Sequence, residues 1–491
     1  MNLNPMLRTD VYKMGHMEQY CPGTDLVYAY LMARSDKIYP HTVFFGLQYY
    51  LQEYLSQRIT EDHADEFLQT REEILGLPNP PEITAKAYAL AKLGYWPVSI
   101  KAVPEGSVIP VRNALLTTKN THPDFPWAGG FLESLLLKIW YPISVATCSF
   151  QYRLMAERYW RKSVPDDVRK AAIKFAVHDF GYRGDKTEEG AGISGVAHLL
   201  SFTGSDTVVA IPTAKQYYGG EKGKIMMSVP ASEHSVMCSF GRDDELEAFR
   251  NMLRLYPEGI VSIVSDTYNV WDVLTDFAEK LKPEILARKG KVVFRPDSGN
   301  PEHIINGNPD STDMREKAGA IRLLDQVFGH AVNSLGYRTL NPKVGLIYGD
   351  AMYLERYERT LATMLAQSYA ASELVIGVGG ILRNFTRDSI GAALKATYVT
   401  INGEPREIEK DPVTDHKKKS HKGLVKLAVS EDGSIYTLDQ CTPEQEDDPA
   451  GLLVPTFCDG KLLHRSTLKE IRNSIDAHVE EILAAEAKAA A

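Results

Sequence analysis

Short apolar runs that end in small or charged residues recur between about residue 170 and residue 390. Most are followed by segments with helical periodicity, and strands that alternate with helices predict a parallel sheet. Polar residues with binding chemistry follow several runs, which favours an α/β barrel whose C-terminal rim is the active face. An open doubly wound sheet is the alternative, and it would place its ligand at one switch point. The predicted strands are residues 175–177, 208–211, 225–229, 260–264, 292–294, 344–348 and 374–378.

The two ends of the chain differ from this middle region. Helical stretches at 47–55 and 64–75 are followed by an extended piece at 98–110, and after residue 395 the chain is again β-like. We therefore predict a barrel flanked by a second α+β domain that is built from both chain ends. The predicted boundaries are 1–165 and 393–491 for the α+β domain and 166–392 for the barrel. The Ala-rich tail at 482–491 predicts a helix that frays.

Composition narrows the functional class. Hydrophobic residues make up 44% of the 491 residues and charged residues 24%, a balance typical of a globular enzyme. The formal charge of −9 argues against a nucleic-acid partner, so phosphate recognition needs local groups of Arg and Lys. The five cysteines form no metal-type pair, which predicts a reducing compartment. We expect no signal peptide and no apolar stretch of membrane-spanning length, hence no membrane association and a cytoplasmic protein.

The segment 294–301 (FRPDSGNP) follows an apolar run and carries dense binding chemistry. Pro296 ends the strand because it lacks an N–H and fixes φ, and Gly299 allows the backbone to approach a ligand. Arg295 offers a rigid fork of donors for phosphate oxygens, and Asp297 accepts hydrogen bonds from sugar hydroxyls or ligates a metal. This combination suits a phosphorylated sugar, although an ordinary strand-to-loop turn uses the same residue types.

Two further segments offer groups for a ring-shaped ligand. Residues 178–184 (HDFGYRG) present an aromatic face at Phe180 and a guanidinium at Arg183. The alternative is that the phenylalanine is part of the core and the arginine a surface charge. Asp206, in the segment 204–207 (GSDT), either accepts a hydrogen bond from an amide NH₂ or caps a turn.

A histidine and three carboxylates also follow predicted strands. His234, in the segment SVPASEHS, lies just beyond a strand with a glutamate beside it, and it is either catalytic or structural. Asp266 and Asp350 each come directly after an apolar run, and with Asp297 they make three carboxylates on one rim. A single aspartate at such a place is an ordinary helix N-cap, whereas three together are typical of a hydroxyl- and metal-binding set.

Glycines and cations complete the candidate set. The segment 377–380 (GVGG) ends the last predicted strand, where glycine-rich backbone can cradle a phosphate with its N–H groups. Arg387 and Lys395 follow shortly after and supply cations. We interpret the basic run 416–422 (HKKKSHK) as a solvated loop.

Together these motifs occur in one order and at one spacing over almost the whole chain. They closely resemble the nicotinamide phosphoribosyltransferases, a family of type II phosphoribosyltransferases. The motifs are TDVYK (residues 9–13), KAVPEG, HDFGYRG, TGSDT, SVPASEHS, VSDTYN, RPDSGNP, GDAM, GVGG and TRD. The resemblance implies an irregular seven-stranded α/β barrel plus the second α+β domain, in a homodimer whose active sites lie at the subunit interface. It also implies that nicotinamide reacts with 5-phosphoribosyl 1-pyrophosphate to give nicotinamide mononucleotide and pyrophosphate in NAD salvage, with Mg²⁺ as cofactor and ATP as co-substrate.

The resemblance also implies residue roles. The pyridine ring would lie between Phe180 and Tyr12 of the neighbouring subunit, and Asp206 would accept a hydrogen bond from the carboxamide. Arg183 would bind near the ring and the phosphoribosyl group, and ATP would phosphorylate His234. Asp266 and Asp297 would position the ribose and the catalytic groups, and no residue is assigned to Mg²⁺. The ribose and its 5′-phosphate would be held by Gly349, Asp350, Gly379 and Gly380, and the pyrophosphate by Arg295 with the neighbouring chain's Arg34, Arg387 and Lys395.

Four features depart from the pattern of many relatives, and one of them is the short stretch between Arg34 and Thr42. Ala393 stands where a serine is common, and Ala351 follows Asp350 where a glycine is common. The glycine loop at 377–380 is one residue shorter than in relatives with a longer glycine run. The departures at Ala393, Ala351 and the glycine loop affect phosphate geometry, but none of the four removes a charged group.

The same residues distinguish between this function and three alternatives. The main alternative is a nicotinate phosphoribosyltransferase with the same fold and donor, but Asp206 would repel an anionic carboxylate, which favours the amide. A binding protein on a degenerate barrel has no reason to keep three acids and several cations together. A phosphosugar isomerase or aldolase would need a Schiff-base lysine or a paired base at a strand end, and the sequence offers neither.

Overall fold

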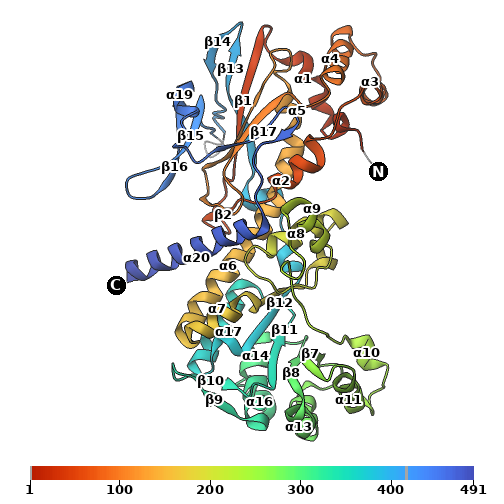
Figure 1. Cartoon of the computed structure of the whole chain (residues 1–491), viewed down its shortest axis with the longest axis vertical. Coiled ribbons are helices and arrows are strands. Elements are labelled where there is room, and N and C mark those ends of the chain that lie inside the picture. The colour runs from red at the N-terminus through yellow and green to blue at the C-terminus, as the bar shows by residue number, and fades with distance from the viewer. Residues whose placement is uncertain (1–2, 415–418, 491) are drawn as a thin grey trace. The chain divides into compact units, whose positions relative to one another are not determined.

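The computed structural model describes residues 3–414 and 419–490 (Figure 1). By its internal packing the chain divides into two compact units. The first, which we call the α+β unit, consists of Met1–Thr147, Ala214–Gly220 and Phe385–Ile475. The second, the parallel-sheet unit, consists of Cys148–Thr213, Glu221–Asn384 and Asp476–Ala491. The domain boundaries at residues 165 and 392 stay a prediction.

Five parallel strands form the sheet of the parallel-sheet unit, in the order β6-β12-β11-β8-β7. Figure 1 labels the last four of them. The five strands are β6 (Val177–Asp179), β12 (Leu374–Val378), β11 (Val344–Tyr348), β8 (Lys289–Arg295) and β7 (Glu258–Val264). β11 is buried along its whole length, as expected for a parallel strand covered on both faces. The predicted strands at 260–264, 292–294, 344–348 and 374–378 are confirmed.

The sheet continues beyond its two edge strands through isolated parallel bridges. The bridged pairs are Asp179–Ser205, Gly204–Met227 and Ala231–Ser262. The result is a curled half-barrel of parallel strands, which confirms the α/β class. Seven strands are reached only when the bridged segments near residues 204 and 227–231 are counted with the five regular ones.

Three predicted strands differ in the structure. The strand expected at residues 175–177 begins later, because Ile173–Phe175 form a 3₁₀ turn and β6 spans Val177–Asp179. Residues 208–211 were expected as a strand, but Ala210–Tyr218 form helix α9. Pro212 lies in the first turn of this helix, where the missing N–H breaks no helical hydrogen bond. Residues 225–229 contribute the bridge at Met227 instead of a regular strand. Short apolar runs do not distinguish a strand from the buried start of a helix.

Aromatic packing joins the helices of this unit to its sheet. Phe294 of β8 contacts Phe249 and Phe328, with ring centroids 6.5 Å and 6.3 Å apart. The helices are α7 (Asp166–Ala172), α8 (Glu188–His198), α10 (His234–Cys238), α11 (Glu245–Leu255), α12 (Val270–Asp272), α13 (Ala278–Ala287), α14 (Pro301–Asn306), α15 (Met314–Ala318), α16 (Ala320–Phe328) and α17 (Leu354–Ala366). The hairpin β9 (His330–Val332) and β10 (Arg338–Leu340) also belongs here. α6 (Trp140–Ser163) and α20 (Leu468–Ala490) each contain a boundary between the units.

The α+β unit is built on a seven-stranded antiparallel sheet in the order β14-β13-β1-β5-β3-β17-β18. Its centre joins the two chain ends, because β1 (Thr24–Met32) pairs with β13 (Ala393–Ile401) as well as with β5 (Ala114–Asn120). This pairing confirms the expected α+β fold from both ends of the chain.

The remaining elements of the α+β unit are short. Its other strands are β2 (His41–Val43), β3 (Val98–Ala102), β4 (Val108–Pro110), β14 (Glu404–Glu407), β15 (Leu424–Val429), β16 (Ile435–Cys441), β17 (Val454–Cys458) and β18 (Lys461–Leu462). Its helices are α1 (His16–Gln19), α2 (Leu47–Tyr50), α3 (Glu61–Leu75), α4 (Pro81–Leu93), α5 (Ala128–Leu136), α18 (Arg387–Ile390) and α19 (Pro443–Glu446). Of the basic run 416–422, residues 416–418 lie outside the described residues.

One helical stretch corrects an expectation from the sequence. Ala128–Ser163 spans 36 residues, and its most apolar window has a mean hydropathy of 1.2. By length and composition alone it is therefore able to cross a membrane, contrary to the expectation that no such stretch exists. Of that window 67% is buried inside the structure, as is usual for a helix in a protein core.

Candidate active site

The ring of Phe180 lies across the ends of two neighbouring strands. Its backbone N donates to Val378 O at 3.0 Å, which fixes the residue just past β6. A Cβ atom added to Gly377 would lie 2.1 Å from the ring, and one added to Gly349 would lie 3.3 Å from it. The ring therefore occupies space that only glycines leave open. Phe180 is half-buried, so one part of its surface remains available to a ligand.

A buried ion network that the sequence did not reveal holds the loop around Phe180. Arg383 donates to Asp179 Oδ2 at 2.7 Å and to Asp185, and all three side chains are at most 1% exposed. Asp179 Oδ1 also accepts from Gly181 N at 2.8 Å. These bonds order the loop and leave the predicted ligand Arg183 exposed on its short 3₁₀ turn.

Asp206 is placed by its backbone beside this loop. Its N donates to Asp179 O at 2.9 Å, and the Ser228 hydroxyl donates to its Oδ1. The carboxylate is exposed. Asp206 is therefore anchored next to the residue that precedes Phe180, with an oxygen-rich side chain that faces outwards.

His234 and three carboxylates come together at neighbouring strand ends. His234 Nε2 lies 3.1 Å from Asp266 Oδ1, and the Asp266 side chain is only 5% exposed. Burial raises the pKa of Asp297, Asp266 and Asp350 raise it further, and Arg295 and His234 oppose the shift. The carboxylates are thus close enough for their charges to interact. We call Phe180, Asp206, His234, Asp266, Asp297 and Asp350 the rim cluster.

Arg295 is held by hydrogen bonds to two serines at neighbouring strand ends. Its Nη2 donates to Ser232 O at 2.7 Å, and its backbone N donates to Ser265 Oγ at 3.1 Å. Its Nε is buried and has no hydrogen-bond partner among the described residues. Ser232 and Ser265 are positioning residues that the sequence did not reveal.

Two glycine-rich loops approach each other at the end of β12. A Cβ atom on Gly184 would lie 3.1 Å from Gly380 Cα, and one on Gly379 would lie 3.5 Å from Phe180 O. A Cβ atom on Gly380 would meet nothing within 4 Å. Backbone is therefore exposed at Gly380, and the phosphate-binding role of the loop stays a prediction.

In the α+β unit the TDVYK motif is fastened to helix α5. Thr9 Oγ1 donates to Phe131 O at 2.8 Å, and Ser134 donates to Asp10. Lys13 Nζ donates to Glu133 at 2.6 Å and to Gly130 O at 2.7 Å, in a site where Lys13 is only 1% exposed. Tyr12 by contrast is 64% exposed. These contacts hold three side chains of the motif and leave the ring of Tyr12 exposed, with its centroid 5.1 Å from Lys13 Nζ.

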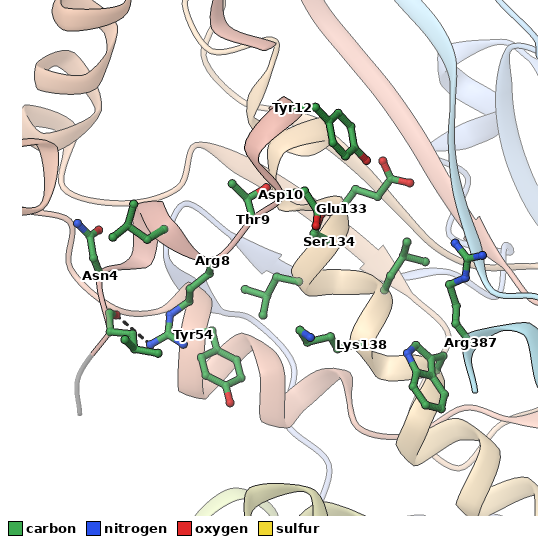
Figure 2. Close-up of a pocket in the computed structure, with 15 residues that line it drawn as sticks. Asn4, Arg8, Thr9, Asp10, Tyr12, Tyr54, Glu133, Ser134, Lys138 and Arg387 are labelled. Atoms are coloured by element: carbon green, nitrogen blue, oxygen red, sulfur yellow. Dashed lines mark hydrogen bonds between the residues drawn. The ribbon is translucent and has the colours of Figure 1, made fainter. Parts of the chain in front are cut away.

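Tyr12 and Arg387 line one cavity of about 580 Å³ within this unit (Figure 2). Asp10, Glu133 and Lys138 are among its other polar lining residues. The cavity thus combines an exposed aromatic ring with both signs of charge.

Lys395 belongs to a group of cations in the same unit. Burial lowers its pKa, and Arg34, Lys410 and Arg387 lower it further, while Glu133 raises it. Arg34 is fixed by its Nε, which donates to Gly391 O at 3.2 Å. We call Tyr12, Arg34, Arg387 and Lys395 the Tyr12 cluster.

No metal centre is preformed in the part of the chain that the structure describes. Within residues 3–414 and 419–490, no group of three or more His, Cys, Asp or Glu side chains is placed to hold a metal ion. A Mg²⁺ ion that arrives with substrate phosphates needs only one or two protein carboxylates. The acids of the rim cluster fit that lesser requirement.

The fold has counterparts among solved structures. Nicotinate-nucleotide pyrophosphorylase from Pyrococcus furiosus has a TM-score of 0.59 at 15% identity, covering 97% of this chain and 96% of its own. Human nicotinic acid phosphoribosyltransferase has a TM-score of 0.55 at 18% identity, covering 96% of this chain and 93% of its own. At these identities the similarity is one of fold.

Sequence comparison goes further. The nicotinate phosphoribosyltransferase (NAPRTase) family matches residues 175–454, and the N-terminal domain of nicotinamide phosphoribosyltransferase matches residues 4–73. Nicotinamide phosphoribosyltransferase from Acinetobacter baylyi is 41% identical over 97% of this chain and 98% of its own. The enzyme of that name from Xanthomonas campestris pv. campestris is 35% identical over 96% and 98%. The chain is therefore an enzyme, a phosphoribosyltransferase, and it belongs to the nicotinamide phosphoribosyltransferase family.

Proposed function

We propose that this enzyme transfers the phosphoribosyl group of 5-phosphoribosyl 1-pyrophosphate to nicotinamide, giving nicotinamide mononucleotide and pyrophosphate. The observation that carries the proposal is the placement of Asp206 beside the Phe180 loop. Phe180 offers a flat face for a pyridine ring, and the exposed Asp206 carboxylate offers an acceptor for an amide NH₂. The relatives named above support the same substrate.

The reaction requires that the substrates are positioned and that charge is stabilised both on the ribose and on the leaving group. Departure of pyrophosphate from the anomeric carbon builds positive charge on the ribose and negative charge on the leaving group. Asp266 and Asp297 would stabilise the ribose. The pyridine nitrogen attacks without a general base because it carries no proton. Mg²⁺ on the pyrophosphate would neutralise the leaving group. Asp297 and Asp350 are our candidates to hold it, because they follow the adjacent strands β8 and β11.

We further propose that ATP phosphorylates His234. Asp266 engages Nε2, so Nδ1 is the nitrogen available to attack the γ-phosphorus. The new N–P bond forms as the bond from the γ-phosphorus to the β,γ-bridging oxygen breaks, and ADP leaves. Asp266 stabilises the ring while it carries positive charge. His234 begins helix α10 and is 47% exposed, so a nucleotide phosphate can reach it.

The His234→Ala variant tests this step. ATP should no longer stimulate mononucleotide formation, whereas slow synthesis without ATP should persist because the contacts to ring and ribose remain. Incubation with ATP labelled in the γ-phosphate should transfer label to the wild type and not to the variant. His122→Ala, at a partly exposed histidine of the α+β unit, is the matched control. Undiminished ATP stimulation in His234→Ala removes this histidine from the mechanism.

We also propose a homodimer in which the Tyr12 cluster of one subunit completes the site of the other. Tyr12 would close the ring site opposite Phe180, and the cations would face the pyrophosphate. The exposure of Tyr12 and the gathering of Arg34, Arg387 and Lys395 support this role.

Nicotinate phosphoribosyltransferase activity is the alternative. It is favoured by the family match at residues 175–454 and opposed by the charge of Asp206, which repels a carboxylate. A single assay distinguishes the two. The enzyme is incubated with the phosphoribosyl donor, Mg²⁺ and either base, and mononucleotide is quantified by chromatography. Faster conversion of nicotinate than of nicotinamide refutes the proposed substrate.

A further inference from the structure

His178 is a half-buried imidazole close to the base site, and the roles described so far do not use it. It lies two residues before Phe180, so both side chains project from the same face of the chain. The two rings meet edge to face, with centroids 6.2 Å apart and planes at 64°. His178 therefore lies against the ring that we assign to base stacking.

The site for this imidazole is built by a glycine. A Cβ atom on Gly204 would lie 2.5 Å from both Cδ2 and Nε2 of His178. Any other residue at 204 would displace the ring. Gly204 lies two residues before Asp206, so the same segment carries the carboxylate and makes room for the histidine.

Charged and titratable groups face His178 from several elements. Burial lowers its pKa, and the carboxylates of Asp206 and Asp179 oppose that shift without reversing it. Asp179 is already paired with Arg383. His198 of α8 lies near enough to interact, and burial lowers the pKa of His198 to about 4. At neutral pH both imidazoles are therefore uncharged, and the Asp206 carboxylate is a negative charge near His178.

We propose that His178 is a specificity-determining residue whose uncharged ring leaves Asp206 to decide between amide and acid. With a neutral imidazole, position 178 does not offset the negative charge of Asp206, and the site should admit nicotinamide in preference to nicotinate. A cation at position 178 would offset Asp206 and admit the carboxylate. This inference rests on the proposed function, because it concerns the choice of base in that reaction.

The test is a pH series of base selectivity. The ratio of kcat/KM for nicotinamide to kcat/KM for nicotinate is measured from pH 8 to pH 5 at saturating phosphoribosyl donor. Protonation of His178 on acidification should lower the ratio by about fivefold or more in the wild type. In His178→Gln, which cannot become charged, the ratio should stay flatter over the same range. Because a ratio is measured, groups that act equally on both bases cancel.

A second readout keeps the inference separate from catalysis. NMR of labelled histidine follows the His178 ring as nicotinate or nicotinamide is added without the phosphoribosyl donor. Nicotinate should raise the pKa of His178, because a bound carboxylate stabilises the charged ring, and nicotinamide should not. Equal pH dependence of selectivity in wild type and His178→Gln, or no difference between the bases by NMR, overturns the inference. Failure of the wild type to make nicotinamide mononucleotide would instead overturn the proposed function, and the NMR titration would still decide the role of His178.

Discussion

The rim cluster and the Tyr12 cluster hold their side chains in different ways. In the rim cluster, residues follow strand ends and are fixed by backbone bonds, such as Phe180 N to Val378 O. In the Tyr12 cluster, side-chain ties to helix α5 present an exposed ring. The clusters also differ in charge. The acids are in the rim cluster, whereas three of the four cations predicted to face the pyrophosphate are in the Tyr12 cluster. A reaction that needs ribose contacts and a cationic site for pyrophosphate therefore requires both.

Subunit complementation tests this division most strongly. Tyr12→Ala and Asp297→Ala should each be almost inactive alone, because every site in either homodimer lacks one residue. After subunit exchange, half of the dimers are mixed, and each has one site with both residues intact. Activity should therefore recover to about a quarter of the wild-type value. Mononucleotide formation before and after exchange is the measurement.

The control for this experiment combines two rim substitutions. Asp297→Ala mixed with Asp266→Ala should give no recovery if both acids of a site come from one chain. Absence of recovery with Tyr12→Ala, after mass spectrometry has established exchange, refutes the shared site. The same outcome would place Tyr12 and Asp297 in one subunit's site.

The sequence predicted the positions of the acids in the rim cluster, but it did not predict the side-chain contacts that hold the loops. Strand ends are visible as apolar runs followed by polar residues, so Asp266, Asp297 and Asp350 could be placed on one rim. The ties that hold the loops join residues far apart in sequence. Arg383 and Asp179 are 204 positions apart, and Lys13 and Glu133 are 120 apart. No local pattern signals such pairs, and the proposed boundaries and residue roles stay predictions.

Loss of the ion pair between Lys13 and Glu133 should have the next largest effect on activity. In Lys13→Met, Glu133 loses its partner at 2.6 Å and the turn that carries Tyr12 loses its buried anchor. We expect KM for nicotinamide to rise about tenfold, since small misplacements of a binding group are costly, with a smaller change in KM for the phosphoribosyl donor. Lys92→Met, at an exposed lysine of α4, is the matched control. Equal increases in both KM values would indicate general destabilisation instead.

The lowered pKa of Lys395 predicts that the affinity for pyrophosphate changes a few-fold with pH. A lysine binds pyrophosphate as a cation, and burial together with Arg34 makes its charge easier to lose. Pyrophosphate binding should therefore weaken as pH rises through a pKa below the usual value of 10.5. Lys395→Arg should extend binding to higher pH, because a guanidinium stays protonated. Calorimetric titration with pyrophosphate at several pH values measures the shift, and identical profiles in both proteins contradict it.

The smallest expected effect concerns strain at the rim. Ala351 has φ of +49°, a left-handed conformation that costs a residue with a Cβ roughly 1–2 kcal/mol. The turn is held in place, since Arg356 Nη1 donates to Ala351 O at 3.0 Å and Tyr152 donates to Met352 O at 2.8 Å. Ala351→Gly should relieve the strain, offset by the greater freedom of glycine in the unfolded chain, for a net gain of up to about 1 kcal/mol in unfolding free energy. Ala362→Gly, on the exposed face of the following helix α17, should instead lose about 0.5–1 kcal/mol. Denaturant unfolding of the two variants should give shifts of opposite sign. A shift of the same sign in both would mean that Ala351 is not strained and that the rim needs no glycine beside Asp350.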